Sequence, residues 1–245
     1  MCSVVTGLPV SGQSRICVNA KSPMSGGIGD SQAGGFFPAE VKFAGFDGIV
    51  ITGKADKPVY LWLHNGKAEL RDAAHLWGKN TKFVDKRLKE ELDDPKVQIA
   101  QVGPAAEKGV LFSSIVNMVN RNNGRTGMGT VMASKNLKAV AVRGTAKVAA
   151  ADSKKILELA RQGAKDVKNN PDMDGLAVHG TASVVAYQND AGTLPTRNYT
   201  EGQFEGVAKI SGETMTETIL KNNDTCYSCA VRCKRVVEAE KDGYK

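Results

Sequence analysis

The sequence has few of the features that mark several common classes of protein. Aromatic residues make up 6% of its 245 residues, and only three residues are histidine. No apolar run approaches the roughly 20 residues that a membrane-spanning helix requires, so we expect a soluble protein with no membrane contact. The first twelve residues, MCSVVTGLPVSG, lack a basic region followed by a long apolar core, so they do not resemble a secretory signal.

The sequence also lacks a disulfide framework. It has five cysteines, an odd number, and three of them lie within the stretch CYSCAVRC at 226–233. A reducing cytoplasm that keeps thiolates available for metal is the expected compartment. The net charge of +7 is spread along the chain, and no basic run is interleaved with aromatic residues that could stack on bases, so we expect no nucleic-acid partner.

Hydrophobic and charged residues make up 41% and 24% of the chain, as in ordinary globular proteins. The pattern predicts an α+β protein with two domains, 1–149 and 150–245. Strands are expected mainly before residue 150, at 48–53, 59–64, 67–70, 96–103, 110–117 and 138–144, with an Asn65-Gly66 hairpin turn and one helix at 81–92. Helices are expected after it, at 152–167, 181–190 and 211–223.

Cys226, Cys229 and Cys233 have the spacing C-x2-C-x3-C, which brings soft sulfur ligands close together on one turn. An iron–sulfur cluster is the interpretation that this spacing favours. A zinc site and plain buried thiols are the two alternatives, and no histidine follows Cys233 to complete a zinc site. Either metal site needs a further ligand from elsewhere.

The stretch RNNGRTGMGT at 121–130 is the second candidate site. Glycines allow backbone N–H groups to approach an anion, and the guanidinium groups of Arg121 and Arg125 suit phosphate oxygens. The stretch is neither a P-loop nor a dinucleotide fingerprint, and a glycine-rich turn between two strands would explain it equally well. No pattern assembles a catalytic acid, base or nucleophile.

The order of several motifs resembles the tungsten-dependent aldehyde ferredoxin oxidoreductase family over nearly the whole chain. The most specific of them are AEVKFAGFDGIVITGKA, GTVMASKNLKAVAV and CYSCAVRC, and SRICVNAKSP, HLWGK, QVGPAAEKGV and HGTA follow the same order. The resemblance implies a first domain of two β-sheets with flanking helices, which binds a metal through two pyranopterins. The start of an all-α domain that carries iron–sulfur cysteines would follow it.

The resemblance also assigns residues. It implies that Arg15 lies between the pterin and a [4Fe-4S] cluster, and that Cys226, Cys229 and Cys233 are three of the cluster ligands. Pterin contacts are implied for two segments, Gln32, Ala33 and Gly34 in the first and Arg121, Asn122, Asn123, Gly124 and Arg125 in the second. Magnesium is a candidate link between the pterin phosphates. No catalytic residue is implied within this chain.

The activity implied is oxidation of a small aldehyde to a carboxylic acid, with electrons passing through the cluster to ferredoxin or a similar carrier. Tungsten is the first choice of metal and molybdenum the second, and a homo-oligomer is expected for the full-length enzyme. The same resemblance leaves open a subunit of a related aromatic acyl-thioester reductase or an oxidoreductase with another substrate. A non-catalytic zinc-binding module is the alternative from a different class. Because family members are longer, we expect these residues to be an internal portion of a larger enzyme, with the fourth cluster ligand outside it.

Overall fold

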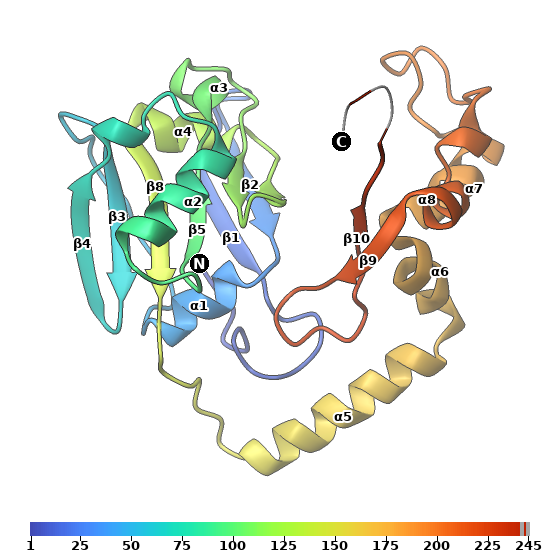
Figure 1. Cartoon of the computed structure of the whole chain (residues 1–245), viewed down its shortest axis with the longest axis horizontal. Coiled ribbons are helices and arrows are strands. Elements are labelled where there is room, and N and C mark those ends of the chain that lie inside the picture. The colour runs from blue at the N-terminus through green and yellow to red at the C-terminus, as the bar shows by residue number, and fades with distance from the viewer. Residues whose placement is uncertain (241–242, 244–245) are drawn as a thin grey trace. The chain divides into compact units, whose positions relative to one another are not determined.

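The chain folds into two compact units, drawn in Figure 1. The computed structural model describes residues 1–240 and 243. Unit 1 consists of Met1–Pro9 and Gln13–Ser153, and unit 2 consists of Val10–Gly12 and Lys154–Lys245. No helix among the described residues is both long and apolar enough to cross a membrane.

Unit 1 is built on a six-stranded mixed sheet with the strand order β4-β3-β8-β5-β6-β7. Its strands are β3 (Val59–His64), β4 (Lys67–Asp72), β5 (Gln98–Gln101), β6 (Ile115–Asn117), β7 (Arg121–Asn123) and β8 (Leu137–Arg143). Strands β3 and β8 run parallel, and the other neighbours are antiparallel. Strand β8 is buried at every position except its last, which explains its nearly continuous apolar sequence.

A two-stranded antiparallel sheet forms the second sheet of unit 1. It pairs β1 (Ile16–Lys21) with β2 (Ile28–Ala33), and the register sets Ile16 opposite Ala33. Every second residue of β2 is buried, as expected for a strand with one face packed on the core.

Helices cover both faces of the large sheet, so unit 1 has two apolar cores. Residues of β3 alternate between them: Tyr60 and Trp62 pack with α2 (Thr81–Glu91), whereas Leu63 packs with α1 (Phe37–Phe43) and α4 (Met128–Ser134). The short η1 (Ala74–Leu76) and α3 (Pro104–Glu107) complete the unit. The predicted α+β class, with two sheets and flanking helices, is confirmed.

Two strand predictions in unit 1 are wrong in whole or in part. Residues 48–53 form no strand, and Val50 is 87% exposed, because no neighbouring strand pairs with this segment in the described part of the chain. Within 110–117, only the last three residues form a strand, since residues 111–112 make a turn. The hairpin at Asn65-Gly66 is confirmed, and both residues have positive φ.

Unit 2 is mainly helical. Its helices are α5 (Ser153–Asn169), α6 (Pro171–His179), η2 (Gly180–Val184), α7 (Val185–Asp190), η3 (Val207–Lys209) and α8 (Gly212–Thr218). The helix predicted over 211–223 ends at Thr218, and β9 (Leu220–Asp224) follows it. Strand β9 pairs antiparallel with β10 (Lys234–Val237). The backbone groups of β10 complete a hydrogen-bond ladder that β9 could not form if the helix continued. The asparagine-rich LKNND sequence also favours leaving the helix.

Candidate functional site

Strand β2 carries the first predicted cofactor segment at its end. One further step of the β1–β2 register places Arg15 opposite Gly34, and the Ser14 hydroxyl donates to the Gly35 carbonyl oxygen at 2.7 Å. Gln32 is exposed, while Ala33 is 3% exposed and turns its side chain inward. The structure therefore brings Arg15 together with the 32–34 segment.

The second predicted segment is bonded directly to β2. The Asn123 side-chain amide donates to the Ser31 carbonyl oxygen at 2.8 Å, and the Arg125 backbone N–H donates to the Ser31 hydroxyl at 3.1 Å. The Thr126 hydroxyl donates to the Asp30 carbonyl oxygen at 3.1 Å. Residues separated by more than ninety positions in sequence thus form one surface. We call the exposed residues of this surface the arginine patch: Arg15, Gln32, Asn122, Gly124 and Arg125.

Arg121 lies behind the arginine patch. It is 3% exposed, and its Nη1 donates to Asn120 Oδ1 at 2.7 Å. Gly35, with φ +108°, makes this packing possible, because a Cβ at Gly35 would lie 2.6 Å from Met118 Sδ and 3.3 Å from Arg121 Cγ. The buried side chains of Arg121 and Asn123 therefore support the exposed residues of the patch from beneath.

The charge of the arginine patch suits an anionic ligand. Arg15 and Arg125 are exposed, and no carboxylate among residues 1–240 and 243 forms an ion pair with either guanidinium. At Gly124 a Cβ would meet only Asn122 Cβ, at 3.8 Å, so the backbone there is open to a ligand. A pterin with phosphate groups is anionic and flat, and these residues fit such a group chemically.

Two isolated cysteines in unit 1 are held as thiols. Burial raises the pKa of Cys2 to about 11. Burial also raises the pKa of Cys17, and the hydrogen bond from its Sγ to Asp30 Oδ1, 2.5 Å long, adds to the effect. The same bond is the main cause that lowers the pKa of Asp30. The raised pKa values make thiolate formation at both cysteines less favourable than at an exposed cysteine.

The predicted metal ligands lie in unit 2, on the loop 225–233 between β9 and β10. Cys226, Cys229 and Cys233 are half-buried, and none of them forms a disulfide. The loop is tightly turned: the Cys229 N–H donates to the Cys226 carbonyl oxygen at 3.2 Å, and the Thr225 hydroxyl donates to the Cys229 carbonyl oxygen at 2.7 Å. We call this segment the cysteine loop.

Arg235 fastens the cysteine loop to the end of α6. Its Nη1 donates to the carbonyl oxygens of Ala177 and Val178, at 2.9 and 2.5 Å, and its Nη2 donates to the Arg232 carbonyl oxygen. Gly180 lies against the same loop, since a Cβ there would be 2.7 Å from the Cys233 carbonyl oxygen. This contact explains why the HGTA motif contains a glycine directly after α6.

The donor set of the cysteine loop suits a soft metal centre, because three free thiols lie within one hairpin loop. In the part of the chain that the structure describes, however, no three histidine, cysteine or carboxylate groups are gathered as metal ligands would be. The assignment of Cys226, Cys229 and Cys233 as ligands stays a prediction, as does that of the pterin contacts.

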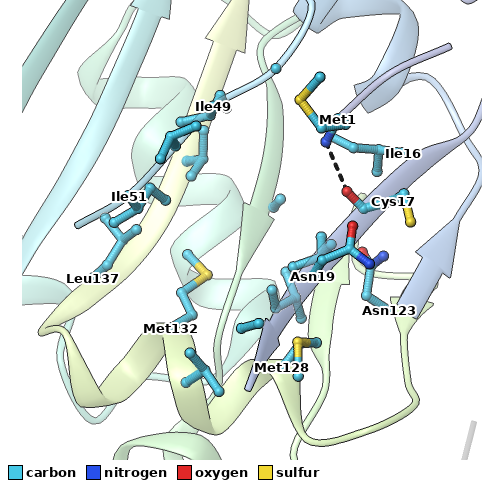
Figure 2. A pocket seen from close by; sticks show the side chains of 18 of the residues that line it. Met1, Ile16, Cys17, Asn19, Ile49, Ile51, Asn123, Met128, Met132 and Leu137 are labelled. Carbon is cyan, nitrogen blue, oxygen red and sulfur yellow. Dashed lines mark hydrogen bonds between the residues drawn. The ribbon is translucent and has the colours of Figure 1, made fainter. Parts of the chain in front are cut away.

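A separate, mainly apolar pocket of about 350 Å³, open on one side to solvent, lies in unit 1. Figure 2 shows Ile49 and Ile51 on one side of it and Cys17 and Asn19 of β1 on the other, with Met132 of α4 below. Of the residues predicted to bind the pterin, only Asn123 lines this cavity. The cavity is therefore distinct from the arginine patch.

Comparisons with known proteins agree with the motifs. Residues 1–144 match the family described as aldehyde ferredoxin oxidoreductase, N-terminal domain, and residues 158–245 match its domains 2 and 3. The tungsten-containing aldehyde ferredoxin oxidoreductase of Pyrococcus abyssi is 45% identical over 94% of this chain, and that of Thermococcus kodakarensis is 42% identical over 95%. The chain spans 38% and 40% of their lengths.

A solved structure is also similar. It is the active-site complex BamBC of benzoyl-coenzyme A reductase, bound to 1,5-dienoyl-CoA, with a TM-score of 0.78 and 30% identity. The match covers 96% of this chain and 38% of the other chain. Sequence motifs, family matches and fold all agree, and the chain belongs to the aldehyde ferredoxin oxidoreductase family.

Proposed function

We propose that this chain is the cofactor-binding portion of an enzyme that oxidises small aldehydes to carboxylic acids. In this proposal, residues 1–149 form the pterin-binding domain, and residues 150–245 begin a helical domain that carries the cluster cysteines. The metal is tungsten, with molybdenum as the second choice, bound by two pyranopterins whose phosphates magnesium could link. The names of the relatives support this assignment, although the chain spans only 38% of the length of the Pyrococcus abyssi protein.

The arginine patch is the observation that carries the proposal. The bonds from Asn123 and Arg125 to Ser31 fix the two predicted segments beside one another. Arg125 would hold pterin phosphates, since a guanidinium group binds phosphate oxygens in pairs. Arg15 would lie between the pterin and the cluster. Gly34 and Gly124 would let the flat ring system approach the backbone, where a side chain would hold it away.

The bound cofactor would supply the redox chemistry, in which an aldehyde and water give a carboxylic acid, two protons and two electrons. The chain's own residues bind and orient the cofactor by charge and shape. Cys226, Cys229 and Cys233 would supply thiolates to a [4Fe-4S] cluster, which would provide one-electron transfer toward ferredoxin. Cys2 and Cys17 lie outside the C-x2-C-x3-C spacing and are assigned no role in the cluster.

Metal and cofactor analysis of the complete enzyme that contains this chain, purified without oxygen, tests the proposal. We expect tungsten, iron and acid-labile sulfide, together with pterin released on denaturation. Molybdenum in place of tungsten would change only the choice of metal. Zinc alone, with no iron and no pterin, would instead identify a zinc-binding module and overturn the proposal.

A related reductase is the second candidate, and the similarity to the benzoyl-coenzyme A reductase complex favours it. In that case the same patch and loop would bind the same kinds of cofactor, and the substrate would be an aromatic acyl-thioester. Assays of the complete enzyme with an aldehyde and a dye acceptor, and with an aromatic acyl-coenzyme A and a strong reductant, distinguish the two.

A further inference from the structure

Arg235 of β10 carries a positive charge that no carboxylate in the described part of the chain compensates. Its guanidinium group is half-buried, and the backbone carbonyl oxygens of Ala177, Val178 and Arg232 accept hydrogen bonds from it. Carbonyl oxygens satisfy N–H donors but bring no net negative charge. A half-buried cation without a counter-charge is unfavourable, so a negatively charged group is expected beside it.

One N–H of the same guanidinium group has no hydrogen-bond partner. The Nε of Arg235 is buried and bonds to no atom of the described residues, whereas both terminal nitrogens donate to carbonyl oxygens. A Cβ at Gly180 would lie 3.4 Å from this Nε and 2.7 Å from the Cys233 carbonyl oxygen, so the glycine leaves room for both atoms. Buried donors in folded proteins are nearly always paired, so this one indicates a missing acceptor.

Cys233 is the predicted cluster ligand that lies beside Arg235. It directly precedes β10, and side chains two positions apart on an extended chain lie on the same side. Burial lowers the pKa of Arg235, while the negative charge of a Cys233 thiolate raises it, so the two side chains interact electrostatically. A cation with an unused N–H therefore lies next to one of the three thiols of the cysteine loop.

We propose that Arg235 stabilises the negative charge of a thiolate-ligated cluster on the cysteine loop and thereby raises the reduction potential of that cluster. This inference rests on the proposed function, in which Cys226, Cys229 and Cys233 hold a [4Fe-4S] cluster. Reduction adds one electron and makes the cluster more negative, and a nearby positive charge or N–H donor favours the reduced form. Arg235 is therefore a positioning residue and not a ligand.

The cysteine loop also contains an arginine that serves as a matched control. Arg232 directly precedes Cys233, but its side chain is exposed, and its Nη2 donates to the Asn223 carbonyl oxygen at 2.9 Å. Water and salt screen an exposed charge more strongly than a half-buried one. If position and burial decide the effect, removing the charge of Arg235 changes the cluster much more than removing that of Arg232.

Three variants of the complete enzyme that contains this chain test the proposal. Arg235→Gln removes the charge and keeps an N–H donor, Arg235→Lys keeps the charge without the forked guanidinium group, and Arg232→Gln is the control. Each protein is purified without oxygen, and its iron and acid-labile sulfide are measured. The reduction potential of the cluster is then determined by titration with dithionite, followed by electron paramagnetic resonance.

We expect Arg235→Gln to lower the equilibrium constant for reduction by about tenfold or more, which for one electron is a shift of about 59 mV or more to a more negative potential. Arg235→Lys should recover at least about half of this shift, and Arg232→Gln should change the constant by less than about threefold. An unchanged potential in Arg235→Gln, or equal shifts in Arg235→Gln and either other variant, would overturn the proposal.

The iron content decides the remaining outcomes. If Arg235→Gln holds no cluster, retention of iron by Arg235→Lys supports the proposal, because both variants lack the guanidinium group and differ in charge. Loss of iron from both variants overturns it, since the geometry of the bonds and not the charge is then what matters. An unmodified enzyme with zinc and no iron overturns the proposed function together with this inference, whereas a cluster whose potential is independent of Arg235 overturns this inference alone.

Discussion

The side-chain amide of Asn123 donates to the backbone carbonyl oxygen of Ser31 across 2.8 Å, and Asn117 donates to Asn123 Oδ1 across 3.1 Å. Asn123 is 1% exposed, so both bonds are shielded from water. The bond to Ser31 joins β7 to β2, and the two halves of the arginine patch lie at the ends of these strands. Asn123, which is predicted to contact the cofactor, therefore also stabilises the packing of β7 against β2.

Replacing Asn123 by alanine removes both bonds and leaves the Ser31 carbonyl oxygen and the Asn117 amide without their partner. We expect the free energy of unfolding to fall by about 2–4 kcal/mol, since each buried polar group left unsatisfied costs roughly 1–3 kcal/mol. Urea denaturation followed by circular dichroism measures the change. Asn122→Ala is the matched control, because Asn122 is an exposed neighbour, and it should shift stability by less than about 0.5 kcal/mol. Equal effects of the two variants would contradict this role.

Local patterns were sufficient to predict much of the fold. The β-branched and aromatic run at 59–64, the Asn65-Gly66 turn and the helical periodicity of 81–92 each depend on residues close together in sequence. The structure places these elements within one or two residues of the prediction. The strand prediction for residues 48–53 was wrong because a strand also needs a partner strand. The sequence of the segment itself does not indicate whether a partner is present.

The arginine patch could be predicted only as a set of separate segments. Sequence spacing identified Arg121 and Arg125, but not that Arg121 is buried while Arg125 is exposed. Ser31, which accepts bonds from both Asn123 and Arg125, gave no signal, because one serine in a strand resembles any other. Such roles depend on contacts between residues more than ninety positions apart, which composition and periodicity do not report.

The cysteine loop permits a direct test of the cluster assignment. Cys226→Ser, and equally Cys229→Ser or Cys233→Ser, should weaken iron binding by more than about tenfold, because loss of a ligand costs at least as much as loss of a residue that orients one. Iron and acid-labile sulfide per chain, measured after anaerobic reconstitution, give the result. Cys17→Ser is the control, since Cys17 lies outside the C-x2-C-x3-C spacing, and it should retain the unmodified iron content. Equal losses in Cys17→Ser would contradict the assignment.

Lys138 of β8 and Glu107 of α3 form a buried ion pair, with side chains 0% and 4% exposed. Glu107 also accepts from the Gly78 N–H at 2.7 Å, and Lys138 donates to the Lys79 carbonyl oxygen at 3.1 Å. Lys138→Met alone leaves a buried carboxylate without its counter-charge and should destabilise unit 1 by roughly 3–5 kcal/mol.

Adding Glu107→Gln to Lys138→Met should recover part of that loss, because the buried charge is removed and an oxygen that can accept from Gly78 is kept. Urea denaturation of the single and double variants measures the difference. A double variant less stable than Lys138→Met would show that the charge of Glu107 is not what destabilises the single variant.

Tyr60 makes the stability of unit 1 depend on alkaline pH. Its ring is fully buried, and its hydroxyl donates to Glu91 Oε1 at 2.7 Å. Burial, assisted by this hydrogen bond, raises the pKa of Tyr60 from 10.0 to about 12. The folded chain therefore holds this proton more tightly than the unfolded chain does. The resulting stabilisation is complete below pH 10 and is lost as the pH rises toward 12.

Tyr60→Phe should remove this dependence, since phenylalanine has no proton to lose. Between pH 10 and 12, the unmodified chain should lose roughly 2–3 kcal/mol more unfolding free energy than the variant, because each pKa unit corresponds to about 1.4 kcal/mol. Urea denaturation across this range measures both, and lysines that titrate there affect them equally. Tyr187→Phe is the control, because Tyr187 is 73% exposed, and its pH profile should follow that of the unmodified chain. Parallel profiles for Tyr60→Phe and the unmodified chain would mean that Tyr60 ionises as readily in the folded chain as in the unfolded one.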